Sequence, residues 1–101
     1  MKEFEFTDID ELIHGKIRLG IMTLLNTLEE AEFGYIRDVL KTTDGNLSVH
    51  LRKLEEAKYI QIKKSFVKRK PLTVCKATKK GVHAFAEYLK NMEKLLYGKI
   101  E

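Results

Sequence analysis

Residues 42–60, TTDGNLSVHLRKLEEAKYI, combine hydrogen-bonding groups and positive charge on one side of a predicted helix. Leu47, Leu51 and Leu54 are spaced as one face of an α-helix, so this face is expected to be buried. The opposite side carries a small apolar group, two cations and two short polar groups. These residues are Val49, Arg52, Lys53, Asn46 and Ser48. Such a mixture can contact base edges and phosphates. The alternative is an ordinary solvated helix face, and this segment alone does not decide between the two.

The surrounding signals define the ends of this helix, which is predicted over residues 44–57. Thr43 or Asp44 is expected to cap its first turn by accepting a hydrogen bond from a backbone N–H. Lys58 occupies the position where a left-handed residue, normally glycine, ends a helix. A lysine there is mildly strained, or else the helix ends in another way. A shorter helix is predicted just before it, and the two are joined by a tight turn over residues 41–43, as in a helix-turn-helix motif. The shorter helix runs from about Phe33 to Leu40, with four residues directed inward: Phe33, Ile36, Val39 and Leu40.

After the long helix, the apolar residues alternate instead of following a helical period. Ile60 and Ile62, followed by Lys64, indicate a strand with one buried face. A returning strand is expected over residues 72–77, where Leu72, Val74 and Lys76 alternate with the residues between them. The connecting turn is predicted over residues 65–71, SFVKRKP, with Pro71 ending the strand pairing. The hairpin therefore carries three consecutive cations in its loop: Lys68, Arg69 and Lys70.

Charge is distributed unevenly along the chain, although the net charge is only +4. Residues 58–80 contain nine basic side chains and no acid, namely Lys58, Lys63, Lys64, Lys68, Arg69, Lys70, Lys76, Lys79 and Lys80. Residues 1–32 contain eight acids, namely Glu3, Glu5, Asp8, Asp10, Glu11, Glu29, Glu30 and Glu32. This asymmetry suggests one side that binds a polyanion and a separate side facing away from it. A solvated lysine-rich surface is the alternative.

The first and last helices are predicted to carry more apolar surface than one neighbouring helix can cover. The first helix is expected to begin near Asp8, with a capping-box-like start at Thr7 and Asp10 or at Asp8 and Glu11. His14-Gly15 is a point at which it kinks or splits. Residues 26–32 are interpreted as its end and a turn. The last helix is predicted from a Thr78 cap to about Leu96. Its apolar line is Val82, Phe85, Ala86, Leu89, Met92 and Leu96, and Tyr88, Leu95 and Tyr97 lie off that line.

Several classes of protein are disfavoured by the same sequence. A chain of 101 residues suits a single domain over residues 1–101, and no apolar run is long enough to span a bilayer. The N-terminus lacks a secretory apolar core, so a cytoplasmic protein is expected. The three histidines fall on three different predicted helices, without metal-ligand spacing. His50 is expected to be packed or bonded to backbone, and Cys75 to be a strand residue rather than a redox sensor. Without a phosphate loop or paired carboxylates, we expect no catalysis, no cofactor and no metal.

The order helix, helix, helix, strand, basic loop, strand, helix resembles a winged-helix DNA-binding domain, an α+β fold that is mainly helical. The phrase DGNLSVHLRKLEEAKYI resembles the recognition-helix signature of the MarR/ArsR-like winged helix-turn-helix transcriptional regulators. HGKIRLGIMTLL resembles the segment that precedes the helix-turn-helix there. The resemblance extends from about Ile9 to Leu96. Two departures stand out: Lys58 replaces a usual glycine, and the paired cysteines of metal-sensing ArsR relatives are missing.

The resemblance implies a homodimer built mainly from the first and last helices. Its two recognition helices, residues 44–57, would enter successive major grooves of a pseudo-palindromic double-stranded DNA site, and its wings, residues 65–71, would reach flanking DNA. Asn46, Ser48, Val49 and Arg52 would face the bases and Lys53 a phosphate. The full candidate set is Thr43, Asn46, Ser48, Val49, Arg52, Lys53, Lys68, Arg69 and Lys70. The alternatives are a winged-helix module that binds protein and a non-specific architectural DNA-binding module.

Overall fold

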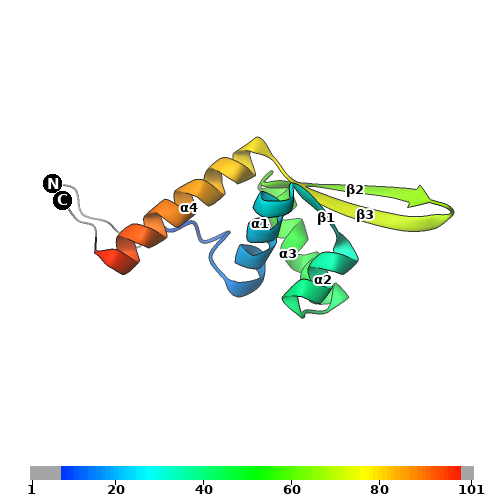
Figure 1. The fold of residues 1–101 in the computed structure, drawn as a ribbon, viewed down its shortest axis with the longest axis horizontal. Helices are drawn as coiled ribbons and strands as arrows, with labels where there is room; N and C mark the ends of the chain where they lie inside the picture. Colours follow the sequence, from blue (N-terminus) through cyan, green and yellow to red (C-terminus); the bar gives the residue numbers. More distant parts are fainter. Residues whose placement is uncertain (1–7, 99–101) are drawn as a thin grey trace.

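The computed structural model describes residues 8–98 as four helices and a three-stranded antiparallel sheet. The elements follow the order α1 (Lys16–Leu28), β1 (Glu30–Glu32), α2 (Phe33–Leu40), α3 (Asp44–Glu56), β2 (Ile60–Val67), β3 (Lys70–Ala77) and α4 (Lys79–Tyr97). Helices α1, α2 and α3 form the centre of an elongated molecule, from which the β2–β3 hairpin and α4 extend at opposite ends (Figure 1). This arrangement confirms the predicted winged helix-turn-helix fold.

The first helix begins at Lys16 rather than near Asp8, because the chain changes direction at Gly15. Gly15 has a φ of 138°, a conformation that favours glycine and is incompatible with a continuous helix. The preceding segment forms a separate turn, in which the Asp10 carboxylate accepts hydrogen bonds from the backbone N–H groups of Leu12 and Ile13, at 2.9 and 3.4 Å. Of the expected capping residues, Asp10 thus caps a turn instead of a helix, and Thr7 lies outside the described residues.

The helix-turn-helix agrees with its predicted bounds. Helix α2 spans the predicted residues and ends in a left-handed residue, Lys41, with a φ of 53°. The backbone N–H groups of Lys41 and Thr42 donate back to the carbonyls of Asp38 and Arg37, at 3.3 and 3.2 Å, which closes the tight turn. One detail of the prediction is wrong. Val39 was expected to face inward, but it is 44% exposed.

The sheet contains a strand that was not predicted. Residues 30–32 were interpreted as part of a turn, yet they form β1 and pair antiparallel with residues 74–76 of β3. The resulting strand order is β1-β3-β2, so the hairpin is joined to the body by a third strand rather than standing as two strands alone. A strand of three residues is too short to show an alternating pattern. It exists because β3 offers a partner for its backbone groups.

The hairpin is longer, and its turn tighter, than the sequence suggested. Residues 65–71 were predicted as a loop, but β2 continues to Val67 and β3 begins at Lys70, with Pro71 paired to Phe66. Only Lys68 and Arg69 form the turn, both with positive φ, at 52° and 66°. Such a turn follows the natural twist of a two-stranded ribbon. Because β1 pairs only with residues 74–76, Pro71 lies beyond it on an open edge, where its missing N–H is tolerated.

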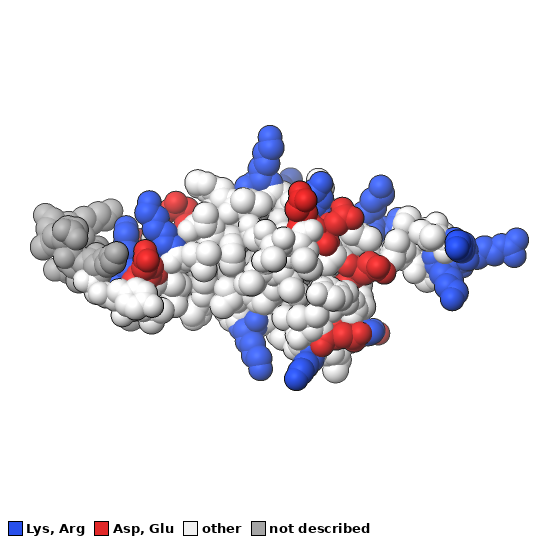
Figure 2. All heavy atoms as spheres, in the orientation of Figure 1, with Lys and Arg blue, Asp and Glu red and all other residues white. Residues whose placement is uncertain are grey.

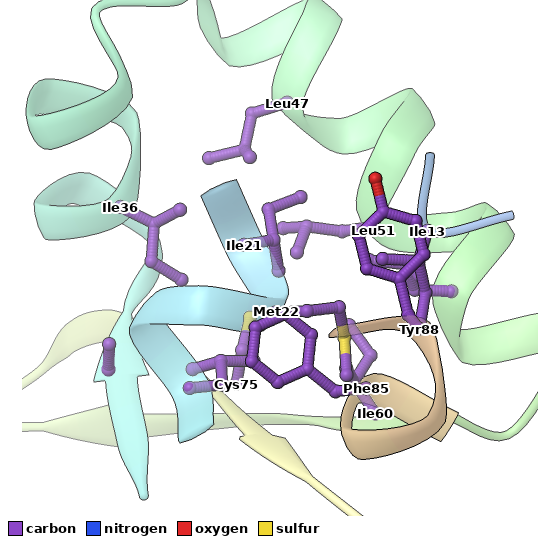
Figure 3. Packing of buried hydrophobic residues seen from close by; sticks show 13 residues of the cluster. Ile13, Ile21, Met22, Ile36, Leu47, Leu51, Ile60, Cys75, Phe85 and Tyr88 are labelled. Carbon is purple, nitrogen blue, oxygen red and sulfur yellow. The ribbon is translucent and has the colours of Figure 1, made fainter. Parts of the chain in front are cut away.

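One hydrophobic cluster holds the helices, the base of the hairpin and the beginning of α4 together. The labelled side chains of α1, α2, α3, α4 and the sheet point toward one another in Figure 3. The buried residues are Ile13, Ile21, Met22, Leu25, Ala31, Ile36, Leu47, Leu51, Leu54, Ile60, Cys75, Phe85 and Tyr88. Cys75 is a strand residue, as predicted, and the structure shows that it is buried. Burial raises the pKa of its thiol to about 11, with a smaller contribution from Glu55, so the reactive thiolate is disfavoured.

Some apolar residues of helix α4 are buried in this core, and others lie on an exposed side of the helix. Phe85 and Tyr88 are buried, so Tyr88 belongs to the core although it was predicted to lie off the apolar line. Val82, Leu89 and Leu96 are 47, 50 and 66% exposed. They recur every seven residues, which places them on one side of the helix. Among the described helices, none is long and apolar enough to cross a membrane.

Candidate nucleic-acid interface

Helix α3 is anchored from its inner side, which sets the direction of its outer side. Leu47, Leu51 and Leu54 are at most 2% exposed, as their spacing predicted. The candidate residues Asn46, Ser48, Val49, Arg52 and Lys53 are all exposed. Burial of each leucine contributes about 1.5–3 kcal/mol, so rotating the helix to hide these polar residues would be strongly unfavourable.

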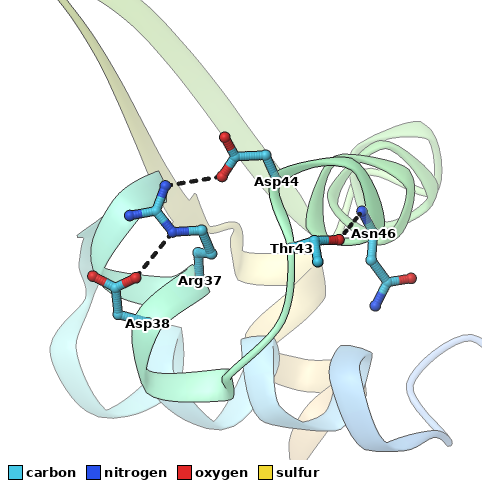
Figure 4. A network of polar contacts seen from close by, with 5 residues as sticks. All are labelled: Arg37, Asp38, Thr43, Asp44 and Asn46. Carbon is cyan, nitrogen blue, oxygen red and sulfur yellow. Dashed lines mark hydrogen bonds and ion pairs between the residues drawn. The ribbon is translucent and has the colours of Figure 1, made fainter.

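The beginning of α3 is fixed by a cap and an ion pair (Figure 4). The Thr43 hydroxyl accepts a hydrogen bond from the Asn46 backbone N–H at 3.1 Å, so Thr43 rather than Asp44 is the cap. Arg37 of α2 donates to the carboxylates of Asp38 and Asp44, both at 2.9 Å. Arg37 thereby neutralises the only acid in the first turn of α3 and ties the two helices of the motif together. Arg37 was not among the residues expected from the sequence, because no local pattern connects positions seven residues apart across a turn.

Asn46 is placed on the exposed side, but its amide is partly engaged. Its side-chain nitrogen donates to the Thr42 hydroxyl at 2.7 Å. The same side chain still has a carbonyl oxygen and a second N–H for another partner. The contact therefore orients Asn46 without using all of its hydrogen-bonding capacity.

The other end of α3 has the left-handed terminus expected from Lys58. Lys58 has a φ of 67°, and its backbone N–H donates to the Glu55 carbonyl while that of Tyr59 donates to Leu54, both at 2.9 Å. The phenol of Tyr59 then donates to Asp10 at 2.6 Å, which holds the segment before α1 against this corner. Burial raises the pKa of Tyr59 to about 12, with a further contribution from the Asp10 hydrogen bond.

As expected from the sequence, His50 supports α3 and is not part of its exposed face. Its Nδ1 lies 2.8 Å from a guanidinium nitrogen of Arg18 in α1, which donates this hydrogen bond, so the ring nitrogen must be unprotonated. Arg18 also donates to the Leu12 backbone carbonyl. Burial, followed by the charges of Arg18 and Lys53, lowers the pKa of His50 below its usual 6.5. The partner of His50 is thus a side chain of α1.

A groove of about 650 Å³ separates α3 from the hairpin. From the helices it is lined by Phe33, Ser48, Leu51, Arg52 and Glu55, and from the hairpin by Ile62, Lys64 and Thr73. The groove is therefore lined by Ser48 and Arg52 on the α3 side and by Lys64 and Thr73 on the hairpin side. Lys64 and Thr73 were not among the candidate residues. Lys64 follows the alternation of Ile60 and Ile62, so its face was visible in the sequence. The sequence did not show that this face of the hairpin lies across a groove from α3.

The cations of the wing lie apart from α3, at the far end of the hairpin. Lys68, Arg69 and Lys70 are all exposed. Lys and Arg side chains gather at this end in Figure 2, whereas Asp and Glu side chains lie over the neighbouring part of the body. The expected separation of charge into two sides is incomplete, because β1 places Glu30 directly opposite Lys76 of β3. Among the described residues, no group of three or more His, Cys, Asp or Glu is arranged to hold a metal ion.

Known proteins share both the sequence and the fold. The family model of the winged helix DNA-binding domain matches residues 17–96. An uncharacterized protein of Methanocaldococcus jannaschii is 42% identical over 79 residues, which cover 78% of this chain and 86% of that protein. The solved structure of a transcriptional regulator homologue from Pyrococcus horikoshii OT3 superposes with a TM-score of 0.83 and 31% identity, covering 88% of each chain.

A more distant structure shares the fold alone. The MarR-family transcriptional regulator from Silicibacter pomeroyi has a TM-score of 0.62 at 11% identity, over 88% of this chain and 62% of that one. These similarities agree with the MarR/ArsR-like winged helix-turn-helix expected from the recognition-helix phrase. From the family match and the shared architecture together, the chain belongs to the winged helix DNA-binding domain family.

Proposed function

We propose that this protein is a sequence-specific transcriptional regulator that binds a pseudo-palindromic DNA site as a homodimer. The observation that carries the proposal is the exposed, anchored face of α3, with Arg52 beside the hairpin groove and a basic wing at its far end. The similarity to a transcriptional regulator homologue from Pyrococcus horikoshii OT3 supports it.

In this proposal α3 lies in the major groove. Asn46, Ser48 and Arg52 offer hydrogen bonds to base edges, and Val49, which is 43% exposed, suits the methyl group of thymine. Lys53 contacts a phosphate beside them. Thr43, besides capping α3, lies at the exposed N-terminal end of the helix, where phosphate oxygens are favoured by the helix dipole.

The wing acts on flanking DNA. Three exposed cations lie at its tip, namely Lys68, Arg69 and Lys70. No acidic residue on the hairpin reduces their positive charge, since β2 and β3 contain none. Contacts between lysine or arginine and phosphate release counterions, so they contribute affinity that falls steeply with salt and does not depend on sequence. Specificity in this proposal comes from α3 and a share of the affinity from the wing.

Dimerisation is inferred from a line of exposed apolar side chains on α4. Val82, Leu89 and Leu96 recur with the spacing of a helix–helix seam. On α1, Leu28 is also exposed, at 43%. A second copy that covers these residues would remove apolar surface from water and present two α3 helices to one duplex, with half-sites about 34 Å apart.

Selection of binding sites from random duplexes, combined with the mass of the protein in solution, tests the proposal. We expect enrichment of a two-fold symmetric site and a mass of twice 11.8 kDa. Leu89→Lys should produce a monomer with reduced affinity for the selected site, whereas Lys90→Ala, at the exposed neighbouring position, should remain a dimer. Equal affinity for random and selected duplexes would instead indicate an architectural DNA-binding module. Negligible duplex affinity would favour a module that binds protein.

A further inference from the structure

The tip of the hairpin exposes apolar side chains as well as cations. Phe66 is 77% exposed, the largest value among the large hydrophobic residues that the structure describes. Pro71 lies directly opposite it on β3 and is also exposed. Neither belongs to the hydrophobic core. The Phe66 ring therefore adds little to the burial that stabilises the fold, although a single exposed aromatic residue would need no explanation.

The strand register determines which way this apolar pair faces. In a strand, alternate residues lie on the same face, and directly paired residues share that face. Phe66 and Pro71 are therefore on the same face as the pair Lys64 and Thr73. Lys64 and Thr73 line the groove beside α3. Phe66 thus extends the α3-facing side of the hairpin toward its tip, about 7 Å beyond Lys64 along the strand.

Val67 provides the contrast at the neighbouring position. It is 51% exposed, but it is paired with Lys70 on the opposite face of the hairpin. The same tip therefore carries one apolar residue that faces the α3 side and one that faces away. Immediately beyond them, Lys68 and Arg69 form the turn and are both exposed, and side chains of this type commonly bond phosphate oxygens.

We propose that Phe66, backed by Pro71, is an apolar wedge that enters the minor groove of the flanking DNA and partly unstacks one base step. Apolar side chains such as phenylalanine and proline are used in this way by proteins that bend DNA, because the widened groove allows more contact with the protein. The cations of the turn would hold the strands while the ring is inserted. This wedge rests on the proposed DNA binding and adds to it a contact that carries no charge.

The test uses the full chain and a selected duplex that carries 2-aminopurine at each flanking position in turn. Wild-type protein should raise 2-aminopurine fluorescence at one step on each flank of the symmetric site, because unstacking relieves quenching. Phe66→Val removes the ring but places a β-branched residue, which strands favour, at this position. It should abolish the fluorescence rise and weaken binding about tenfold. It should leave the salt dependence unchanged because no charge is lost. Val67→Ala, on the opposite face, should retain both the fluorescence rise and the affinity.

A second measurement does not depend on removing the ring. The sequence has no tryptophan. Phe66→Trp therefore introduces a single reporter, which should be quenched when it stacks on a base in the selected duplex. Val67→Trp should not be quenched. If wild-type protein binds the duplex but neither fluorophore responds, the wedge is wrong and the proposed function stands. If no duplex is bound at any salt concentration, both fail together.

Discussion

Helix α3 and the tip of the β2–β3 hairpin differ in how firmly the rest of the molecule holds them. Helix α3 has three buried leucines, a capped beginning, an ion pair to α2 and a hydrogen bond to α1 through His50. Between residues 64 and 73 of the hairpin, no residue is buried. A segment with few buried contacts opens at a lower free energy than one that is packed into the core.

This difference matches two kinds of DNA contact. Hydrogen bonds to base edges require defined geometry, which the anchored α3 can provide. Contacts to phosphate tolerate variation in position, which suits a hairpin tip held only through its base. The comparison predicts that damage to α3 changes which sequence is bound, whereas damage to the wing changes how tightly any duplex is bound.

The largest effect is expected from crowding the contact between α4 and the turn that follows α3. A Cβ atom on Gly81 would lie 2.0 Å from the Tyr59 backbone carbonyl oxygen, which no side-chain movement can relieve. Gly81→Ala should lower the free energy of unfolding by about 3 kcal/mol or more, measured by urea denaturation. Gly45→Ala is the matched control, because a Cβ there meets nothing within 4 Å, and it should raise stability by about 0.5 kcal/mol. Equal effects of the two substitutions would contradict the packing described for this corner.

The second prediction compares Arg52 with Arg69. Arg52→Ala should cost about 1–3 kcal/mol of binding to the selected site and much less on random duplex, because a base contact is lost. Arg69→Ala should weaken binding to both duplexes similarly and reduce the slope of log affinity against log salt by about one. Fluorescence anisotropy titrations at several salt concentrations would measure both. Reversal of the two patterns would show that the wing determines specificity.

The third prediction concerns strain in the wing. Lys68 and Arg69 both adopt positive φ, which is unfavourable for side chains that carry a Cβ. Asn-Gly is the preferred pair for such a turn. The double substitution Lys68→Asn with Arg69→Gly should therefore raise stability by about 1 kcal/mol in thermal unfolding, while lowering the salt slope of DNA binding by about two. A double variant that binds DNA as tightly as wild type would show that these two cations do not contribute to DNA affinity.

The smallest effect is expected from the pH dependence of α3 anchoring. Because the pKa of His50 is lower in the folded chain than the usual 6.5, the folded state binds fewer protons than the unfolded state in this range. The stability contributed by neutral His50 should be complete above pH 6.5 and decline as the pH falls toward its lower folded pKa. His50→Gln should show a smaller decline between pH 7 and 5.5, as measured by urea denaturation. If the free energy of unfolding falls equally in the variant and in wild type, titratable groups other than His50 cause the pH dependence.

Short-range chemistry was sufficient to predict much of this protein. Periodicity identified α2 and α3, and the leucine line of α3 was predicted correctly because the inner side of a helix must bury apolar residues wherever it packs. Lys58 could be recognised as a candidate left-handed residue for a similar reason, since the end of a helix depends on the next few residues, and the structure decides between the two alternatives in favour of the left-handed conformation. The presence of the hairpin followed from alternation. These features depend on interactions between neighbours in the chain.

Features that join distant residues required the tertiary structure. Strand β1 exists only through its pairing with β3, and Gly15 was recognised as a possible break without showing whether the helix would divide. The two-residue turn was hidden because Lys68-Arg69 is not a usual turn pair. The groove that Lys64 and Arg52 both line depends on the angle between the hairpin and α3. Helix periodicity shows that α4 has an apolar side, but only packing decides that Phe85 and Tyr88 enter the core and that Leu89 remains uncovered.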